Sequence, residues 1–288
     1  MAIQYLLYKN IDLIKYDACI SKSSNSRIYA LTWYLNCVTD SWGVLVLNDY
    51  EAVMPLPKRK KLGINYIYQA PWIQQLGVFS KKSISEELIK DFISRIPKKF
   101  VLVDYFFNSD NIINGKFIKE RNNYILSLNQ GFETIKSNYN KNRKRISNKN
   151  FDDFKLNKDG DIGSFLEFYK KQNFNFKTHR DTFERLEKLL KSKNVAINIW
   201  TISYNGESIA GLVWLKEKRR ITYLLPVANE VAKNNNIPTF LINELIKEHQ
   251  NTNCILDFEG SMIEGVAQFY KSFGAETEAY YWYKKRLI

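Results

Sequence analysis

The sequence predicts an α/β fold of the α+β kind, in which mostly antiparallel strands are flanked by helices. Three observations support this prediction. The 288-residue chain is 45% hydrophobic and 15% aromatic, which is typical of a folded globular protein. Short apolar runs rich in β-branched and aromatic residues alternate with segments of helical apolar spacing. The pair Asn205-Gly206 separates two such runs, which indicates a β-hairpin.

Strands in the first half are predicted where β-branched and aromatic residues cluster, over 43–47, 52–56, 66–69, 101–107 and 123–128. The second of these is expected to end at Pro55, Pro57 and the basic turn that follows. Apolar spacing predicts helices over 10–21, 26–37 and 83–96, although the aromatic content of the second also suits a strand. Ser83, three residues before Glu86, predicts a capping box at the start of the last helix.

The second half shows a clearer order of elements. Apolar residues at helical spacing predict helices over 132–148, 163–174, 180–191, 239–249 and 263–273. Strands are expected over 195–203, 207–214, 220–227, 254–258 and 280–283. The resulting order is helix, helix, antiparallel strands, helix, strand, helix, strand.

Positive charge is concentrated in the first half of the chain. The whole sequence holds 43 Lys plus Arg against 30 Asp plus Glu, a net charge of +13. Residues 1–150 hold 23 basic and 12 acidic residues, a net of +11, so the remainder is almost balanced. The densest clusters are Lys58 to Lys61 and Lys141 to Lys149. Such clusters attract polyanions or anionic membrane surfaces, and a solvated face is the alternative for each.

Several classes of protein are disfavoured by composition. No run approaches the roughly 20 apolar residues that span a bilayer, and the first eight residues lack the pattern of an export signal. Cys19, Cys37 and Cys254 have unrelated spacings, which fits neither a disulfide framework nor a zinc site and favours a reduced, cytoplasmic setting. His179 and His249 lie among charged residues, so we expect exposed helical positions for both, with no metal site and no hydrolase triad.

Residues 267–274, AQFYKSFG, resemble the closing helix of the GNAT acyltransferase superfamily. Residues 256–261, LDFEGS, resemble the segment before that helix in the FemABX-like branch, whose members build peptidoglycan cross-bridges; 54–57, MPLP, and 74–77, QQLG, resemble that branch too. The resemblance implies two GNAT-like domains, a degenerate N-terminal one over 1–128 and a C-terminal acyltransferase domain over 129–288. Each would be a mostly antiparallel mixed sheet flanked by helices.

An acyl donor with a phosphate-bearing tail is well served by backbone N–H groups at a helix N-terminus. The resemblance aligns Lys233, Asn236 and Pro238 with positions that hold Gln or Arg, Gly, and Gly or Ala in acetyl-CoA users. Both small residues are absent, and Pro238 offers no N–H. An ordinary strand-to-helix loop is the alternative. The candidate donor-binding residues are Lys233, Asn234, Asn235, Asn236 and Thr239.

Tyr270 aligns with the tyrosine that many GNAT enzymes use to protonate the departing thiolate, and Lys271 resembles a lysine of FemABX transferases. Either group can protonate a leaving group or stabilise an oxyanion. The alternatives are an aromatic ring packed on the sheet and an exposed helical lysine. We expect Asp257 and Glu259, on the preceding strand, to point to opposite faces and not to form a paired acid and base. Glu259, nearer the open end of that strand, is the candidate to orient or deprotonate an amine.

The sequence thus predicts an acyltransferase that moves an acyl or aminoacyl group onto an amine of a small molecule or a cell-envelope precursor. Its donor would be an acyl-CoA such as acetyl-CoA, or aminoacyl-tRNA held by the basic segment from Lys141 to Lys149. The stretch from Tyr66 to Gln75 places the amides of Gln69, Gln74 and Gln75 beside aromatic rings and Pro71, which suits a carbohydrate or peptide acceptor. The alternatives are a non-catalytic binding protein with a degenerate GNAT fold and a tRNA- or polyanion-binding protein.

Overall fold

The computed structural model describes residues 2–172, 180–260 and 262–286, so the predicted positions of Phe174, His179 and Ser261 lie outside the described residues. The chain divides into two compact units. Unit 1 comprises Met1–Arg121, Arg180–Leu189 and Ala279–Ile288, and unit 2 comprises Asn122–His179 and Leu190–Glu278. Both combine a mostly antiparallel sheet with helices, which confirms the predicted fold class. Strands β7 (Ile118–Ser127) and β13 (Glu276–Arg286) contribute to both units, and a domain boundary at residue 128 stays a prediction.

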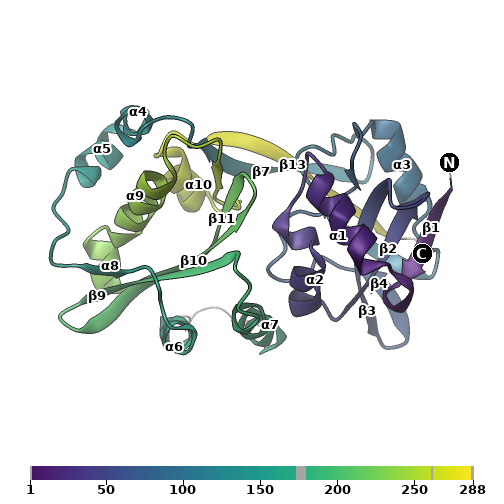
Figure 1. Cartoon of the computed structure of the whole chain (residues 1–288), viewed down its shortest axis with the longest axis horizontal. Coiled ribbons are helices and arrows are strands. Elements are labelled where there is room, and N and C mark those ends of the chain that lie inside the picture. Colours follow the sequence, from purple (N-terminus) through teal and green to yellow (C-terminus); the bar gives the residue numbers. More distant parts are fainter. Residues whose placement is uncertain (1, 173–179, 261, 287–288) are drawn as a thin grey trace. The chain divides into compact units, whose positions relative to one another are not determined.

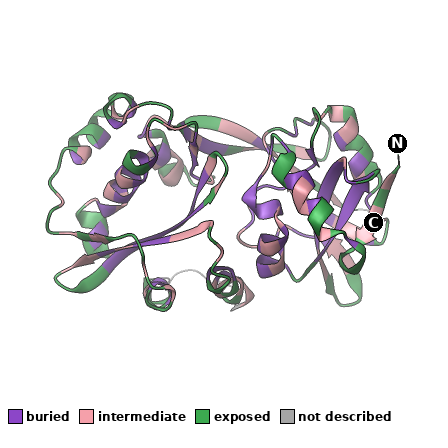
Figure 2. Cartoon of the chain, in the orientation of Figure 1, coloured by how far each residue is buried: buried purple, intermediate pink, exposed green. Residues whose placement is uncertain are grey.

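The sheet of unit 1 has the strand order β1 (Ile3–Leu7), β2 (Ser41–Leu47), β3 (Ala52–Lys61), β4 (Ile64–Ile67), β6 (Phe100–Phe107) and β13, and β5 (Phe79–Ser80) also pairs with β3. Neighbouring strands are antiparallel except β4 and β6, which are parallel. The helices are α1 (Leu13–Lys22), α2 (Thr32–Val38) and α3 (Glu86–Ser94), with 3-10 turns at Tyr8–Asn10 and Ile28–Ala30. β2 and the first part of β3 are buried and form the core of the unit (Figure 2).

Strand β3 is longer than the sequence predicts, because its two prolines do not end it. The Pro57 carbonyl accepts the N–H of Tyr68, and the Pro55 carbonyl accepts the hydroxyl of Tyr105 at 2.9 Å. The nitrogen and the carbonyl of one strand residue point to the same side, so both proline nitrogens face away from β2. The ladder between β2 and β3 therefore loses no hydrogen bond at either proline, and the strand continues to Lys61.

The start of α3 and the extent of α2 also differ from the predicted elements. Ser85, and not Ser83, caps α3, because its hydroxyl accepts the N–H of Leu88 at 3.2 Å. Glu86 and Glu87 then lie in the first turn, where they complement the positive end of the helix dipole. Of the second predicted helix, only Thr32–Val38 is α-helical, and the strand alternative for this segment is wrong.

The sheet of unit 2 begins with the first residues of β13 and continues through β7, β12 (Ile255–Asp257), β11 (Arg220–Ala228), β10 (Glu207–Glu217), β9 (Ile197–Tyr204) and β8 (Lys155–Asn157). β11 and β12 run parallel, while the pairs β7–β12, β10–β11, β9–β10 and β8–β9 are antiparallel. The predicted hairpin between β9 and β10 is confirmed. Asn205 and Gly206 have φ of 50° and 83°, as a two-residue turn of type I′ requires.

The remaining helices are α4 (Phe132–Ser137), α5 (Lys141–Ser147), α6 (Ile162–Gln172), α7 (Arg180–Lys191), α8 (Glu230–Asn234), α9 (Ile237–His249) and α10 (Glu264–Lys271). Within unit 2, α9 packs on β10 and β11 from one face of the sheet and α6 packs on β9 and β11 from the other (Figure 1). Leu241 and Leu245 of α9 lie in one apolar core with Trp200 and Leu212 of the sheet.

Two predictions for unit 2 are wrong in the same way, because each ignored a polar residue with a partner. The single helix over 132–148 is broken into α4 and α5, since the Asn140 side chain accepts the N–H of Arg143 at 2.8 Å and starts a new helix. His249 is buried, with 5% of its surface exposed, and not at an exposed position. Its Nδ1 lies 3.1 Å from the Leu245 carbonyl, and its ring meets the ring edge of Trp214.

The cysteines and the helix lengths complete the description of the fold. Cys19, Cys37 and Cys254 are all buried free thiols. Burial raises the pKa of Cys19 to about 11, so this thiol is protonated and unreactive at neutral pH. Among the described residues, no helix has the length and apolar character needed to cross a bilayer.

Candidate functional site

Two parallel strands of unit 2 part where the shorter one ends. β11 and β12 pair at three positions, from Arg220 with Ile255 to Thr222 with Asp257. β11 then continues beside β10 as far as Ala228, while β12 stops. We call this place the β11–β12 fork. Beyond Thr222, the backbone on this side of β11 is no longer paired with β12.

Four aromatic rings gather at the fork. Tyr223 follows the last paired residue of β11, Phe258 follows β12, and Tyr270 lies near the end of α10. The Tyr270 ring stacks on Phe258 at 4.6 Å between centroids, and it lies 6.3 Å from Tyr223 and 6.5 Å from Tyr124 of β7. All four side chains are buried in the core of unit 2, so the fork has a rigid aromatic wall.

The Tyr270 hydroxyl is a hydrogen-bond donor at neutral pH. Burial, and then the charge of Glu259, raises the pKa of Tyr270 well above its ordinary value near 10. Burial also raises the pKa of Tyr223, with a further contribution from Tyr270. Both phenols therefore keep their protons and can donate to a developing negative charge.

Glu259 lies in a tight left-handed turn directly after β12. Glu259 and Gly260 have φ of 56° and 58°, a region that favours glycine. A Cβ on Gly260 would lie 2.3 Å from the Asn122 carbonyl oxygen and 2.7 Å from the Asn123 Cα, so only glycine fits. We predicted that Asp257 and Glu259 point to opposite faces of one strand. That reasoning is wrong, because residues two apart on a strand share a face. The two residues differ because Asp257 is the last residue of β12, whereas Glu259 lies in the turn after it.

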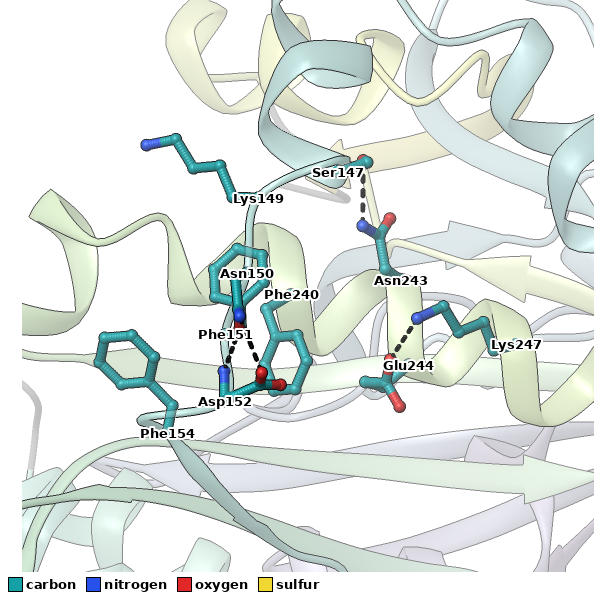
Figure 3. Close-up of a pocket in the computed structure, with 10 residues that line it drawn as sticks. All are labelled: Ser147, Lys149, Asn150, Phe151, Asp152, Phe154, Phe240, Asn243, Glu244 and Lys247. Carbon is teal, nitrogen blue, oxygen red and sulfur yellow. Dashed lines mark hydrogen bonds and ion pairs between the residues drawn. The ribbon is translucent and has the colours of Figure 1, made fainter.

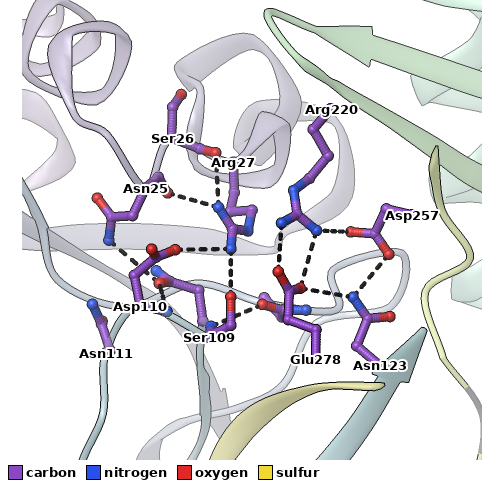
Figure 4. A network of polar contacts seen from close by, with 12 residues as sticks. Asn25, Ser26, Arg27, Ser109, Asp110, Asn111, Asn123, Arg220, Asp257 and Glu278 are labelled. Carbon is purple, nitrogen blue, oxygen red and sulfur yellow. Dashed lines mark hydrogen bonds and ion pairs between the residues drawn. The ribbon is translucent and has the colours of Figure 1, made fainter. Parts of the chain in front are cut away.

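Asp257 belongs to a buried ion-pair network that the sequence analysis missed (Figure 4). Its carboxylate accepts from Arg220 at 2.5 Å, from the Asn123 amide at 2.9 Å and from the Glu259 N–H at 2.8 Å. Arg220 also forms a bidentate pair with Glu278, at 2.8 and 3.1 Å. Asp257 is therefore a fixed anchor for the turn and not a free base.

The charges of this network stabilise one another. Burial alone would lower the pKa of Arg220, but Asp257 and Glu278 outweigh it and raise that pKa further. The sequence contains one signal for this network, which is the acid Asp257 within the apolar run of β12. A carboxylate in a buried strand requires a cationic partner. The partner's identity depended on the pairing of β11 with β12, which the sequence does not show.

Lys271 is adjacent to Tyr270 but is exposed on α10. Its ammonium lies 5.4 Å from the centroid of the Tyr124 ring, a cation–π contact at the edge of the aromatic wall. The structure thus brings Tyr270 and Glu259 together at the fork and leaves Lys271 at its rim.

The predicted donor-binding residues follow β11: Lys233 and Asn234 end α8, Asn235 and Asn236 form the junction, and Thr239 lies in the first turn of α9. Lys233 is exposed and pairs with Glu230 at 2.7 Å, and the Asn235 side chain donates to the Val231 carbonyl at 2.9 Å. Asn234 is exposed beside them. This short helix, α8, was not predicted, and its last two residues, Lys233 and Asn234, begin the segment in which an open phosphate-binding loop was considered.

The start of α9 offers few free backbone donors. The N–H groups of Thr239 and Phe240 both donate to the Asn236 carbonyl, and Pro238 has none. Asn236 has φ of 62°, the left-handed conformation for which glycine is favoured. Thr239 is buried, and its hydroxyl accepts from the guanidinium of Arg143. The geometry is that of a closed loop more than of a pyrophosphate cradle.

The basic segment from Lys141 to Lys149 is not uniformly exposed. Arg143 points into unit 2, where Nε donates to Ser272 at 2.9 Å and the guanidinium lies over the rings of Phe269 and Phe273 at 4.6 and 4.7 Å. Burial lowers the pKa of Arg143. Arg143 thus joins α5 to α10 and is unavailable to a polyanion, which leaves the flanking lysines for that role.

A pocket of about 570 Å³ lies beside α9, and its lining residues include none of the fork (Figure 3). Phe151 and Phe240 stack in it at 4.8 Å between centroids, and Asn150 donates to Asp152 at 2.7 Å. Lys149, the last residue of the basic segment, points away from this stack (Figure 3). The pocket carries both signs of charge, so it offers no single-sign attraction to a ligand.

The predicted acceptor residues lie in unit 1 and are largely held by the unit itself. The Gln69 amide donates to the Ile73 carbonyl, and the Trp72 indole donates to the Thr182 carbonyl at 2.8 Å. Tyr66 packs edge-on against Tyr68 at 6.1 Å. Within the described ranges, no three His, Cys, Asp or Glu side chains gather as a metal site would require.

Neither known protein families nor curated proteins show a match to this sequence. Solved structures do show similarity. FemX has a TM-score of 0.65 and 12% sequence identity, over 98% of this chain and 97% of FemX. A tandem GNAT protein from the clavulanic acid biosynthesis pathway has a TM-score of 0.58 and 7% identity, over 99% and 98% of the two chains.

A third structure, L-PGS from Bacillus licheniformis, has a TM-score of 0.54 and 11% identity, over 94% of this chain and 90% of that one. At such identities the likeness concerns the fold. The agreement extends over nearly the whole length of each chain. The protein therefore has a GNAT-like fold, similar to those of FemX and of a tandem GNAT protein.

Proposed function

We propose that the protein is an acyltransferase that forms an amide by moving an acyl or aminoacyl group onto an amine. The observation that carries this proposal is the Tyr270 phenol at the β11–β12 fork, kept protonated by burial and by Glu259. The fold similarity to FemX and to a tandem GNAT protein supports it. Buried free thiols support a cytoplasmic setting, where thiols stay reduced.

The proposed step joins the amine nitrogen to the acyl carbon and breaks the bond from that carbon to the leaving group. Tyr270 donates a hydrogen bond to the carbonyl oxygen as it becomes an oxyanion. Glu259, directly or through water, accepts the proton that the amine loses. A proton must also reach the leaving oxygen or sulfur. We assign this transfer to Tyr270, which regains a proton from the protonated Glu259, so that the proton lost by the amine ends on the leaving group. Lys271, at the rim, would hold an anionic part of a substrate.

The donor that fits best is an aminoacyl ester such as aminoacyl-tRNA. An alkoxide leaves less readily than a thiolate does, so an ester depends more on a protonated phenol such as Tyr270. The closed loop from Lys233 to Thr239 also disfavours the pyrophosphate of acyl-CoA. The exposed lysines of the segment from Lys141 to Lys149 would then contact the tRNA backbone. The acceptor would be an amine-bearing small molecule or cell-envelope precursor.

The test is amide formation with aminoacyl-tRNA and acetyl-CoA as alternative donors, in the wild type and in Tyr270→Phe. We expect the wild type to form product from aminoacyl-tRNA. The rate for Tyr270→Phe should be at least about 100-fold lower, because removal of one hydrogen-bond donor to an oxyanion has an effect of this size. Glu259→Gln should also slow the reaction, with a smaller loss at higher pH where more amine is already neutral. Equal rates for Tyr270→Phe and the wild type would overturn the assignment.

A second candidate is a non-catalytic binding protein, favoured by Asn236 and Pro238 at the positions where acetyl-CoA users have small residues. In that case the wild type would gain thermal stability from a donor without forming product. Tyr270→Phe would then bind the donor as well as the wild type does. Product formation by the wild type removes this candidate.

A further inference from the structure

One end of the unit 1 sheet gathers lysines from separate segments. The β3–β4 hairpin turns after Lys61, and Asn65 of β4 pairs with Phe100 at the start of β6. The register therefore places 60–61 at the same end as 98–99, which precede β6. Burial, and then the charge of Lys99, lowers the pKa of Lys58, so the two segments also lie within electrostatic reach.

The last residues of β13 reach the same end. Arg286 pairs with Leu102, two residues from the start of β6, and the Lys284 N–H donates to the Phe117 carbonyl at 3.0 Å. We call the whole set the basic end of unit 1: Lys60, Lys61, Lys98, Lys99, Lys116, Lys119, Lys284, Lys285 and Arg286.

These cations are hardly neutralised by the protein. Lys284 pairs with Asp104 at 3.1 Å. In the part of the chain that the structure describes, no carboxylate lies within 4.0 Å of any other member of the basic end. Charges of one sign gathered without counter-charges indicate an anionic partner.

The tip of the β3–β4 hairpin adds exposed apolar side chains to this charge. Leu62 is 92% exposed and Ile64 is 51% exposed, with Lys60 and Lys61 beside them. Phe117, 42% exposed, lies under the ammonium groups of Lys116 and Lys285 at 5.9 and 5.5 Å. An apolar tip flanked by lysines is the pattern of a surface that enters a membrane interface.

Leu62 stands where local energetics favour a different residue. Leu62 and Gly63 have φ of 49° and 80°, and they form the same turn as Asn205 and Gly206, at 50° and 83°. Asn is favoured at the first position because its side chain tolerates the left-handed conformation. A Cβ on Gly63 would meet nothing within 4 Å. The exposed Leu62 side chain therefore adds nothing to the stability of unit 1. An apolar residue at such a position points to an external apolar partner.

We propose that the basic end of unit 1 docks on an anionic phospholipid bilayer, with Leu62 and Ile64 in the interfacial layer and the lysines at the phosphates. Nucleic acid fits less well, because aliphatic side chains do not provide the stacking platforms that bases need. The surface lies in unit 1 and the fork in unit 2, so docking and acyl transfer are separable properties.

The test is sedimentation of the full chain with vesicles of phosphatidylcholine alone or with phosphatidylglycerol. We expect binding that requires phosphatidylglycerol and weakens with salt. Lys60→Gln with Lys61→Gln should weaken binding about 25-fold, at about fivefold per lysine. Leu62→Asn should weaken binding about tenfold through the lost apolar contact while leaving the thermal midpoint unchanged or higher. Weaker binding without a loss of thermal stability excludes misfolding as the cause.

Two matched variants in unit 2 serve as controls. Val195→Asn removes a side chain that is 98% exposed, and Lys141→Gln with Lys144→Gln removes two exposed lysines. Both should bind vesicles like the wild type. Equal weakening by the unit 2 lysines, wild-type binding by Leu62→Asn, or tight binding to single-stranded RNA without vesicle binding would each overturn the proposal. Amide formation with a water-soluble acceptor should be unaffected by Leu62→Asn, which separates this outcome from failure of the proposed activity.

Discussion

The ring of Tyr270 stacks on the ring of Phe258, with centroids 4.6 Å apart and planes inclined by 19°. This contact places a phenol from α10 against the first residue after β12. The stack depends on the ring, and the proposed chemistry depends on the hydroxyl. Variants can therefore separate packing from catalysis.

Tyr270→Phe keeps the stack, so we expect the free energy of unfolding to change by less than about 1 kcal/mol. Tyr270→Ala removes a buried ring and should cost about 3–5 kcal/mol. Urea denaturation of both variants measures the difference. A large loss for the phenylalanine variant would mean that the hydroxyl has a structural partner.

Gly260→Ala should destabilise the protein by about 2–4 kcal/mol, because the new Cβ would meet the Asn122 carbonyl at 2.3 Å in a left-handed turn. Gly206→Ala is the matched control. Its φ of 83° imposes similar strain, but nothing lies within 4 Å of the added Cβ, so a loss of about 1 kcal/mol is expected. Equal losses in denaturation would show that the contact with Asn122 is unimportant.

Arg220→Met should cost about 3–5 kcal/mol, because it leaves the buried Asp257 and the half-buried Glu278 without their cation. Lys15→Met breaks an exposed pair with Asp49, so we expect the free energy of unfolding to stay nearly unchanged. Thermal and urea unfolding of the two variants gives the comparison. A small effect of Arg220→Met would indicate that water replaces the guanidinium.

His249 makes the stability depend on pH in the acidic range. Burial is the main cause that lowers its pKa, so the folded protein holds the neutral ring while the unfolded chain protonates near pH 6.5. The unfolded state therefore binds more protons as the pH falls, and this part of the stability is present above pH 6.5 and lost below it. Urea denaturation at pH 7.5 and 5.5 should show a smaller decrease for His249→Gln than for the wild type. An identical decrease in both would assign the effect to other groups.

Features with local causes were predictable from the sequence. The Asn205-Gly206 hairpin, the strand at 101–107 and the helix that starts near Pro238 all follow from residues close in the chain. The resemblance of 267–274 to the GNAT closing helix agrees with the fold that solved structures share with this chain. The roles of Tyr270 and Glu259 stay predictions that the proposed assays address.

Features that depend on distant partners were not predictable. Pro55 and Pro57 do not end β3, because whether a proline disrupts a strand depends on which side its neighbour lies. Arg143 lies in a basic run yet points inward, because Thr239 and Ser272 are placed beside it by other helices.

Sequence by itself determined the alternation of helices and strands, the hairpin turn at Asn205-Gly206 and the excess of positive charge in the first half, because periodicity and turn chemistry act over a few residues. The tertiary structure decided which charged groups are exposed and which are paired. Asn123, Arg220, Asp257 and Glu278 meet from four strands to hold the fork, and lysines from separate segments meet at one end of unit 1. The physical reason is that strand register, which is set by long-range pairing, fixes which side chains share an edge.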